Sequence, residues 1–202
     1  MTKVFLVSLS EALPYRQQLL SSLSGQRKEK AERFVREIDQ VRSAVGSLLI
    51  RRFAGKEEIL IGPKGKPYFA NGPFFNLSHA GEYVGLAVSD EEVGFDLENI
   101  ERCDLSIVRV AFTAEEGKRI HSKQDFALAW TRKEAVAKCL GDGLTNPRLS
   151  GVEDLGDGRF QYEGETFFIE TLPLDGHYLS VATKKAPPEI QLEVIPAQEL
   201  LK

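Results

Sequence analysis

The sequence predicts an α+β fold in which two similar halves pack together as a pseudodimer. A helical segment followed by strands occupies residues 26–100, and the same order returns in residues 104–183. The segments GEYVGLAV from Gly81 and GHYLSVAT from Gly176 also match at Gly, Tyr and Ala. We therefore expect an N-terminal half at residues 1–102, a C-terminal half at 103–202, and a site in the cleft between them.

The composition narrows the class of protein. The chain has 202 residues, of which 42% are hydrophobic and 28% charged, as in ordinary globular domains. The net charge of -4 argues against nucleic acid and anionic membranes as partners, although it allows a local basic patch for a phosphorylated ligand. Cys103 and Cys139 lack a CxxC spacing, so neither a zinc site nor a disulfide framework is expected. The sequence has no apolar run of about 18 residues and no cleavage signal, which predicts a cytoplasmic protein.

The first half begins with MTKVFLVSLS, which is expected to form a strand. Apolar residues then recur at spacings of three and four, which predicts a helical region over residues 26–53, capped by Ser24 and ended by Gly55. A turn-rich stretch, GPKGKPYFANGP, follows. Residues 74–100 are predicted to form strands, joined by a turn at Ala80-Gly81 and by an acidic hairpin loop from Ser89 to Glu92.

The second half is predicted to be helical at residues 104–120 and 124–140, with Gly141 and Gly143 stopping the second helix. Strands are expected at residues 159–173 and 177–183. The segment after Pro187-Pro188 could add an edge strand or remain a free tail, and both alternatives stay open.

Two carboxylates stand close together in the strand segment VGFDLENI. Because side chains alternate along a strand, Gly94, Asp96 and Glu98 should share one face while apolar residues line the other. Like charges at this distance repel unless a cation or hydrogen-bond donors lie between them, and a divalent metal would resolve the repulsion. The simpler alternative is a solvated strand face.

The helix at residues 124–140 is apolar on two sides, so it should be largely buried. A narrow polar strip remains beside Trp130 and contains Thr131, Glu134 and Lys138. Glu134 and Lys138 could be an ordinary surface pair one turn apart. On a buried helix they are better explained as positioned groups, with the carboxylate near Asp96 and Glu98 and the ammonium facing a phosphate.

Five motifs in order resemble the 4′-phosphopantetheinyl transferases of the two-halved type. They are GKP at Gly65–Pro67, FNLSHAGEYV at Phe75–Val84, GFDLE at Gly94–Glu98, FTAEE at Phe112–Glu116 and WTRKEAVAK at Trp130–Lys138. The resemblance implies the transferase fold with its active site between the halves. It also implies transfer of the phosphopantetheine arm of coenzyme A to a serine of an acyl or peptidyl carrier protein, as in holo-[acyl-carrier-protein] synthases, with release of adenosine 3′,5′-bisphosphate.

The resemblance assigns roles to individual residues. It implies that Mg²⁺, or Mn²⁺ in its place, is held by Asp96, Glu98 and Glu134, and that Lys138 contacts the diphosphate of coenzyme A. Glu116 is the candidate base for the serine proton, and a hydroxide on the metal is the alternative. The remaining residues implied to bind coenzyme A are Arg27, Lys30, Arg42, Ser43, Lys66, Pro67, Ser78 and His79.

Carrier proteins of this kind are acidic around their serine, so the segment from Leu105 to Arg119, with interleaved apolar and basic residues, is predicted to dock them. Its apolar residues could equally pack onto the second half. Because one chain can build the whole cleft, a monomer is expected.

Two other functions remain in view. A noncatalytic relative would be favoured by loss of a metal ligand, and none is lost. Another Mg²⁺-dependent phosphoryl enzyme, a nuclease or phosphatase, would also fit the Asp-x-Glu pair alone. The acidic charge disfavours a nuclease, and neither a Walker loop nor a GxGxxG turn is present.

Overall fold

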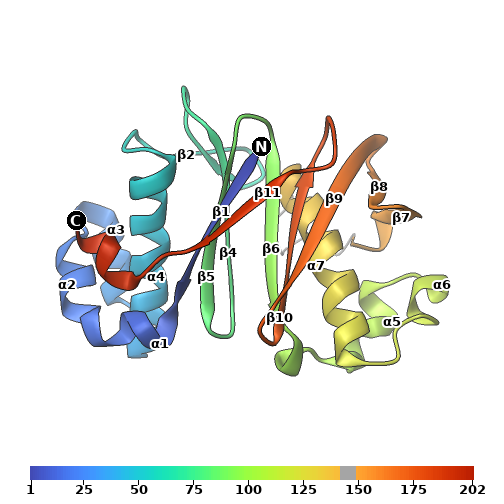
Figure 1. Ribbon diagram of the computed structural model, residues 1–202, viewed down its shortest axis with the longest axis horizontal. Coiled ribbons are helices and arrows are strands. Elements are labelled where there is room, and N and C mark those ends of the chain that lie inside the picture. The colour runs from blue at the N-terminus through green and yellow to red at the C-terminus, as the bar shows by residue number, and fades with distance from the viewer. Residues whose placement is uncertain (142–148) are drawn as a thin grey trace.

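The computed structural model describes residues 1–141 and 149–202 and shows four layers in the order helix, sheet, sheet, helix (Figure 1). The long helix α4 (Glu37–Leu49) covers the first sheet, and α7 (Lys123–Cys139) covers the second. The first sheet has the order β11 (Ile190–Val194), β1 (Thr2–Ser8), β5 (Tyr83–Ser89), β4 (Phe74–Ala80). The second has the order β6 (Val93–Asn99), β10 (His177–Thr183), β9 (Glu165–Leu174), β8 (Arg159–Tyr162), β7 (Glu153–Gly156). The α+β class is thus confirmed.

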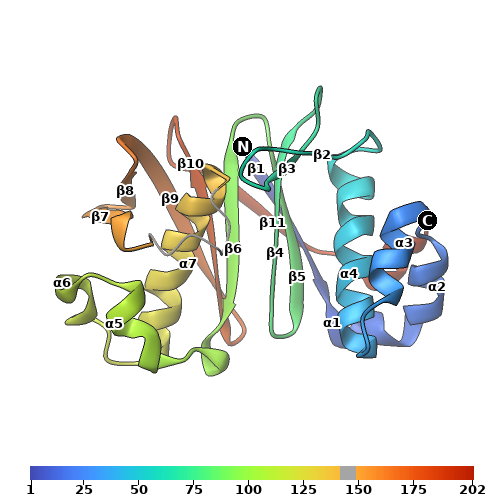
Figure 2. The ribbon, with the colours of Figure 1, turned by 180° about the vertical axis from the view of Figure 1, so that it is seen from behind.

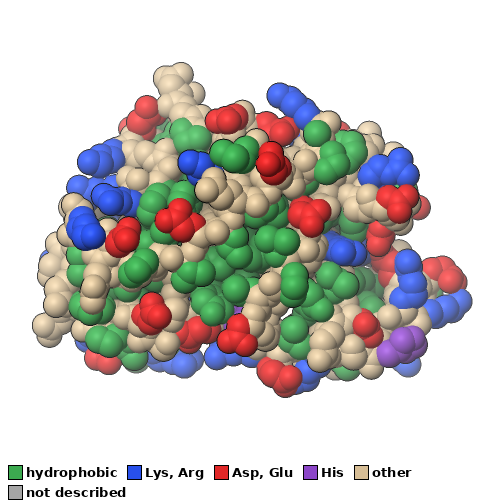
Figure 3. Space-filling view, in the orientation of Figure 1, with side chains coloured by type: hydrophobic (Ala, Val, Ile, Leu, Met, Phe, Trp, Pro, Cys, Tyr) green, Lys and Arg blue, Asp and Glu red, His purple; other side chains and the backbone are tan. Residues whose placement is uncertain are grey.

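Apolar side chains fill each interface between the layers. One cluster joins α4 to the first sheet and includes Leu49, Phe75 and Leu86. A second lies between the two sheets, where Leu6 meets Phe95. Figure 3 shows further apolar side chains gathered over the middle of one face, with charged side chains around them. Burial on both faces is seen in β1, which is buried at six of its seven residues, and in β6, which is buried at its first five residues.

An order of long helix followed by an antiparallel hairpin occurs twice along the chain, as the sequence led us to expect. The matching segments form β5 and β10, and each is the second strand of an antiparallel hairpin, β4–β5 or β9–β10. In each half a long helix packs on the sheet that contains this hairpin.

Two strands, β6 and β11, pair with strands from the other side of the boundary expected at residue 102. β6 pairs with β10 rather than with β5, so residues Ser89 to Glu92 link two sheets and the expectation of a hairpin there was wrong. In the opposite direction, β11 pairs in parallel with β1, which settles the C-terminal segment as an edge strand. Each of these two sheets therefore contains one strand from the other side of that expected boundary (Figure 2).

The helical region expected at residues 26–53 is interrupted. It consists of α3 (Gly25–Glu32), α4 and a π-helical turn (Ile50–Ala54), and Gly55 ends it as expected. The break falls where Arg36 adopts an extended conformation, with φ -85 and ψ 132. Val35 is 96% exposed, so its place in the apolar pattern did not correspond to burial.

The remaining elements are short. The sequence did not reveal α1 (Leu9–Ala12), α2 (Arg16–Ser21) or the 3₁₀ turn between them (Leu13–Tyr15). Residues 104–120 contain a 3₁₀ turn (Leu105–Ile107), α5 (Val108–Ala111) and α6 (Ala114–Gly117) in place of one helix. The other elements are β2 (Leu60–Ile61), β3 (Pro67–Tyr68) and 3₁₀ turns at Ile100–Arg102, Leu149–Gly151 and Ala197–Leu201. Gly143, an expected helix stop, lies outside the described residues.

No helix within the described ranges combines the length and the apolar composition that crossing a membrane requires.

Candidate active site

The site begins where α7 and β6 touch through their backbones. A Cβ at Gly94 would lie 1.9 Å from the carbonyl oxygen of Ala135 and 2.5 Å from the backbone nitrogen of Cys139. Only glycine allows this approach, which brings the carboxylate face of β6 against the polar strip of α7. Figure 2 shows β4, β6 and α7 side by side.

Asp96 is the centre of a buried polar network. Its Oδ1 accepts hydrogen bonds from Lys138 Nζ at 2.5 Å and from Ser78 Oγ at 2.9 Å. Lys138 Nζ also donates to Ser78 Oγ at 3.0 Å. Asp96 is only 3% exposed, so the ammonium balances a carboxylate that burial would otherwise disfavour. Residues from β4, β6 and α7 thus meet at one carboxylate.

The two neighbouring carboxylates are compensated only in part: Lys138 acts to lower the pKa of each, and a hydrogen bond with Trp130 acts to lower that of Glu98. Burial raises the pKa of Glu98 to about 7, and the charge of Asp96 adds to this effect. Burial likewise raises the pKa of Glu134 to about 7, again with a contribution from Asp96, while Lys138 opposes the shift. Both carboxylates would gain from a further positive charge.

The chemistry of these carboxylates fits a divalent cation. Asp96 Oδ2 and Glu134 Oε2 are buried without a hydrogen-bond partner among the described residues. Carboxylate oxygens are the ligands that Mg²⁺ and Mn²⁺ prefer. The spacing is less favourable, since no three His, Cys, Asp or Glu side chains in the described ranges are arranged to hold a metal ion. The metal assignment therefore stays a prediction supported by the unpaired oxygens.

A cavity of about 270 Å³ opens beside this network. The turn before β3, strands β4 and β6, and the end of α7 line it, and its walls include Lys66, Pro67, Ser78, His79, Asp96, Glu98 and Lys138. Partial burial and the nearby charges of Arg42 and Lys138 lower the pKa of His79. The side chains of Lys64, Lys66 and Lys138 also line this cavity, and positive charges favour an anionic ligand.

The remaining residues implied to bind coenzyme A lie on α3 and α4. Arg27 and Lys30 line a separate cavity of about 550 Å³, where Arg27 Nη1 donates to Ser47 Oγ at 3.3 Å. Arg42 forms an ion pair with Asp39. Ser43 accepts a hydrogen bond from Ser47 Oγ through its backbone carbonyl at 3.0 Å. The structure therefore places Arg27 and Lys30 in a different cavity from Lys66, Pro67, Ser78 and His79, and Arg42 and Ser43 line neither of these two cavities.

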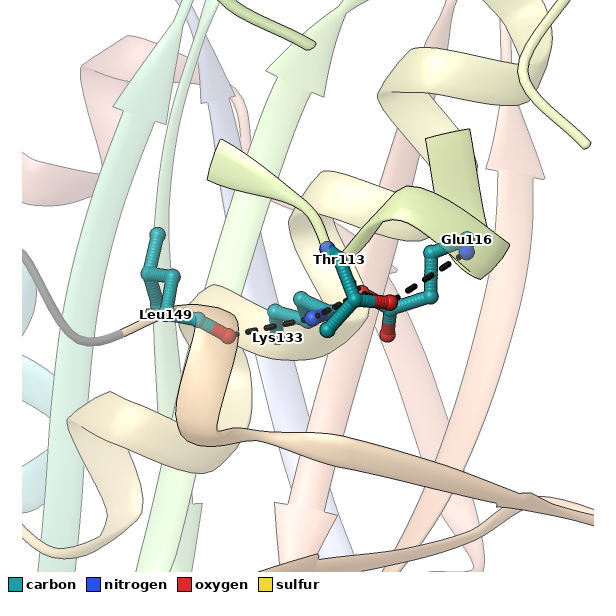
Figure 4. Close-up of polar contacts among 4 residues, drawn as sticks. All are labelled: Thr113, Glu116, Lys133 and Leu149. Atoms are coloured by element: carbon teal, nitrogen blue, oxygen red, sulfur yellow. Dashed lines mark hydrogen bonds and ion pairs between the residues drawn. The ribbon is translucent and has the colours of Figure 1, made fainter. Parts of the chain in front are cut away.

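Glu116 does not line the cavity beside Asp96. It lines a different cavity with Lys133, and its Oε2 accepts hydrogen bonds from Lys133 Nζ at 2.7 Å, Thr113 N at 2.9 Å and Thr113 Oγ1 at 3.0 Å (Figure 4). The bond from Thr113 N, together with a hydrogen bond from Glu116 N to Thr113 Oγ1 at 3.3 Å, forms a capping box that begins α6. Its role as a base stays a prediction, and the geometry shows a structural role.

Two site-forming residues were missed from the sequence. Asn76 accepts a hydrogen bond from Phe95 N through its Oδ1 at 2.9 Å, so β4 holds β6 next to Asp96. Lys133 is 2% exposed, and its ammonium donates to Glu116 and to the Leu149 carbonyl at 3.0 Å (Figure 4). The sequence offered a signal for each: Asn76 shares a strand face with Ser78, and Lys133 lies within a largely apolar helix.

This arrangement is typical of enzymes that act on phosphate-bearing ligands. Carboxylate oxygens without a partner in the described structure could bind a metal ion, and lysine side chains line the adjoining cavity. Comparison with known proteins is in agreement. Residues 92–183 match the 4'-phosphopantetheinyl transferase superfamily. The chain is 31% identical to the 4'-phosphopantetheinyl transferase psf-1 of Bacillus pumilus over 92% of this chain and 89% of that protein. It is 27% identical to the 4'-phosphopantetheinyl transferase Sfp of Bacillus subtilis strain 168 over 92% of each chain.

The chain therefore belongs to the 4′-phosphopantetheinyl transferase superfamily.

Proposed function

We propose that this protein transfers the 4′-phosphopantetheine arm of coenzyme A to a serine hydroxyl of an apo carrier protein. The observation that carries the proposal is the meeting of Asp96, Lys138 and Ser78 in one hydrogen-bonded network on the wall of the cavity. The reaction breaks the diphosphate bond, forms a bond from the serine oxygen to the pantetheine phosphorus, and releases adenosine 3′,5′-bisphosphate. Such a reaction needs positioning of the phosphate and neutralisation of its charge.

The residues would divide the work between them. Asp96, Glu98 and Glu134 would hold Mg²⁺, or Mn²⁺ in its place, because two of their buried oxygens have no partner in the described structure. When bound, the cation supplies positive charge to the phosphate oxygens. Lys138 would move its ammonium from Asp96 towards the diphosphate, a short change for a flexible side chain that already lines the cavity.

The remaining residues implied to bind coenzyme A would hold its nucleotide part. Ser78 and His79 lie on the wall at the end of β4 and would donate to phosphate oxygens. Lys66 and Pro67 would form a wall for the adenine, since Pro67 fixes its own φ and restricts its neighbour. Arg27, Lys30, Arg42 and Ser43 would reach the 3′-phosphate from α3 and α4.

Glu116 remains our candidate for the group that accepts the serine proton. Its carboxylate is held by Thr113 and Lys133, so proton acceptance would require at least one of these hydrogen bonds to weaken.

The carrier would dock on the segment from Leu105 to Arg119. Val110 is 80% exposed and Leu105 is 40% exposed, whereas Phe112 is only 4% exposed and packs against α7. The segment thus contains both apolar residues free for a partner and apolar residues used in the core. We propose an acyl or peptidyl carrier protein as the partner, because Arg109, Lys118 and Arg119 match its acidic surface.

We also propose a monomer built from the halves 1–102 and 103–202, acting in the cytoplasm. A single chain forms the whole cavity beside Asp96. Cys103 and Cys139 are both free thiols in the structure, as is usual in a reducing compartment.

The test is an intact-mass assay with purified protein, coenzyme A, Mg²⁺ and a panel of apo acyl and peptidyl carrier proteins. Carrier mass should rise by one phosphopantetheine arm, and EDTA or Glu134→Gln should abolish the gain. Glu101→Gln serves as the matched control, because Glu101 is an exposed carboxylate that follows β6 and pairs with Lys123. Binding of coenzyme A without a mass gain on any carrier would replace our proposal with a noncatalytic function.

A further inference from the structure

Lys66 joins the turn between β2 and β3 to both elements that carry the carboxylates. Its Nζ donates hydrogen bonds to the carbonyl oxygen of Cys139 at 2.8 Å and to that of Val93 at 2.9 Å. Cys139 is the last residue of α7, and Val93 is the first residue of β6. The ammonium of Lys66 therefore joins the end of α7 to the start of β6.

Both carbonyls need a donor from outside their own element. The last carbonyls of a helix have no partner within it, and a positive charge there interacts favourably with the helix dipole. Among the strands of the described residues, β6 lies at the edge of its sheet and pairs with β10 alone. Phe95 directs its N–H to Asn76 rather than to β10, and Val93, two residues earlier, faces the same unpaired edge.

The stem of Lys66 also contacts the turn that follows α7. Gly141 has φ 83, and a Cβ there would lie 3.2 Å from Lys66 Cβ. Gly141 N donates a hydrogen bond to the carbonyl oxygen of Lys138 at 3.2 Å, so this turn directly follows the last residues of α7. The aliphatic part of Lys66 thus packs against the turn after α7, while its ammonium binds the carbonyl at the end of that helix.

We propose that Lys66 is a positioning residue that caps α7 across the seam between the halves and holds Lys138 at the cavity, and that its ammonium is not a ligand of the 3′-phosphate. Lys138 immediately precedes Cys139, so the cap controls the turn from which the Lys138 side chain extends. The part of this inference that concerns catalysis rests on the proposed function, whereas the cap itself does not.

The first experiment measures hydrogen exchange in the full chain for wild type and Lys66→Met, which keeps the length of the stem. Amides of residues 136–141 should exchange about tenfold faster in the variant, because the last turn of α7 loses its donor. Lys64→Met is the matched control, since it removes a charge from the same turn, where Lys64 pairs with Glu163, and should leave α7 exchange unchanged. Equal exchange in wild type and Lys66→Met would overturn the proposal without any assay of transfer.

The second experiment compares coenzyme A with 3′-dephospho-coenzyme A as donor. A capping role predicts that Lys66→Met lowers kcat for both donors by the same factor, about tenfold, through misplacement of Lys138. A loss confined to coenzyme A, seen in KM and absent with the dephospho donor, would show direct phosphate binding and refute our assignment. Absence of transfer by the wild type would count against the proposed function and leave the exchange result as the test of the cap.

Discussion

The two long helices pack against their sheets in different ways. α4 meets the first sheet through an apolar surface in which Val41, Val45 and Leu49 are fully buried. α7 buries Lys133 and Glu134 at 2% exposure each, together with Thr131, and approaches β6 closely enough that only Gly94 fits between the backbones.

The two helices therefore differ in what they contribute: α4 contributes mainly to the stability of the fold, and α7 also carries polar groups that could take part in chemistry. Apolar contacts on α4 stabilise the fold without specifying a reaction. Buried charges on α7 cost free energy unless they are paired, and buried charged groups of this kind are typical of functional sites. The comparison predicts that substitutions at the buried apolar positions of α4 change stability alone, whereas substitutions at the buried polar positions of α7 change activity and stability in different directions.

The largest effect is expected from Gly94→Ala. The added methyl group would overlap Ala135 O, and since both partners are backbone, α7 must shift away from β6. We expect unfolding to become easier by about 3 kcal/mol or more and transfer to be lost. Thermal unfolding and the mass assay measure both quantities.

Gly117→Ala is the matched control. A Cβ at this position would meet only Val108 Cγ1, at an ordinary contact distance of 3.4 Å. A Gly94→Ala protein as stable as this control would mean that the helix and strand are not in backbone contact.

Leu49→Ala should have the next largest effect on stability. It leaves a cavity in the fully buried cluster under α4, which should cost about 2 to 5 kcal/mol of unfolding free energy. Because Leu49 lies on α4 and packs against the first sheet, whereas the carboxylates lie on β6 and α7, kcat per folded molecule should not change. A loss of kcat at a temperature where the variant remains folded would contradict the separation between the two helices.

Glu134→Gln is expected to stabilise the cation-free protein while abolishing transfer. The pKa of Glu134 is raised from 4.5 to about 7, so its favourable contribution is present below pH 4.5 and is lost as the pH rises through 7. At pH 8 the ionised carboxylate should cost about 3 kcal/mol, which the neutral amide removes. Denaturant unfolding in EDTA should show this gain at pH 8 and less than about 1 kcal/mol at pH 5.

Added Mg²⁺ should reverse the ranking, since only the wild type offers the full carboxylate set. If Glu134→Gln is no more stable than the wild type in EDTA at pH 8, the carboxylate is already compensated and the cation site is not needed to explain it.

The smallest effect on stability is expected at the proposed docking segment. Reversing the charges of Arg109 and Arg119 should raise the Michaelis constant for the carrier several-fold and change unfolding free energy by less than about 0.5 kcal/mol, because both side chains are exposed. Arg33→Glu, on an exposed side chain of the first half, should leave the carrier constant unchanged. An unchanged Michaelis constant in the double variant would remove this segment as the docking surface.

Much of the site could be predicted from local patterns. Alternation along β6 correctly separated Asp96 from the apolar residues that pack between the sheets, and the helical period correctly placed Glu134 on a buried helix. Both predictions depend on side-chain direction within a single element, which the backbone geometry determines. The same reasoning was wrong for residues 26–53, because the period alone does not show whether Val35 has anything to pack against.

By itself, the sequence determined the class of fold, the order of the main elements, the family and the acidic groups beside Lys138. Only the tertiary structure decided that β6 and β11 exchange between the sheets, that the ammonium of Lys66 caps α7, and that Glu116 is held by Thr113 and Lys133. The physical reason is the range of the interactions. Periodicity and turn propensity act over a few neighbouring residues, whereas an edge strand, a helix end and a buried ammonium take their partners from chain segments far away in sequence.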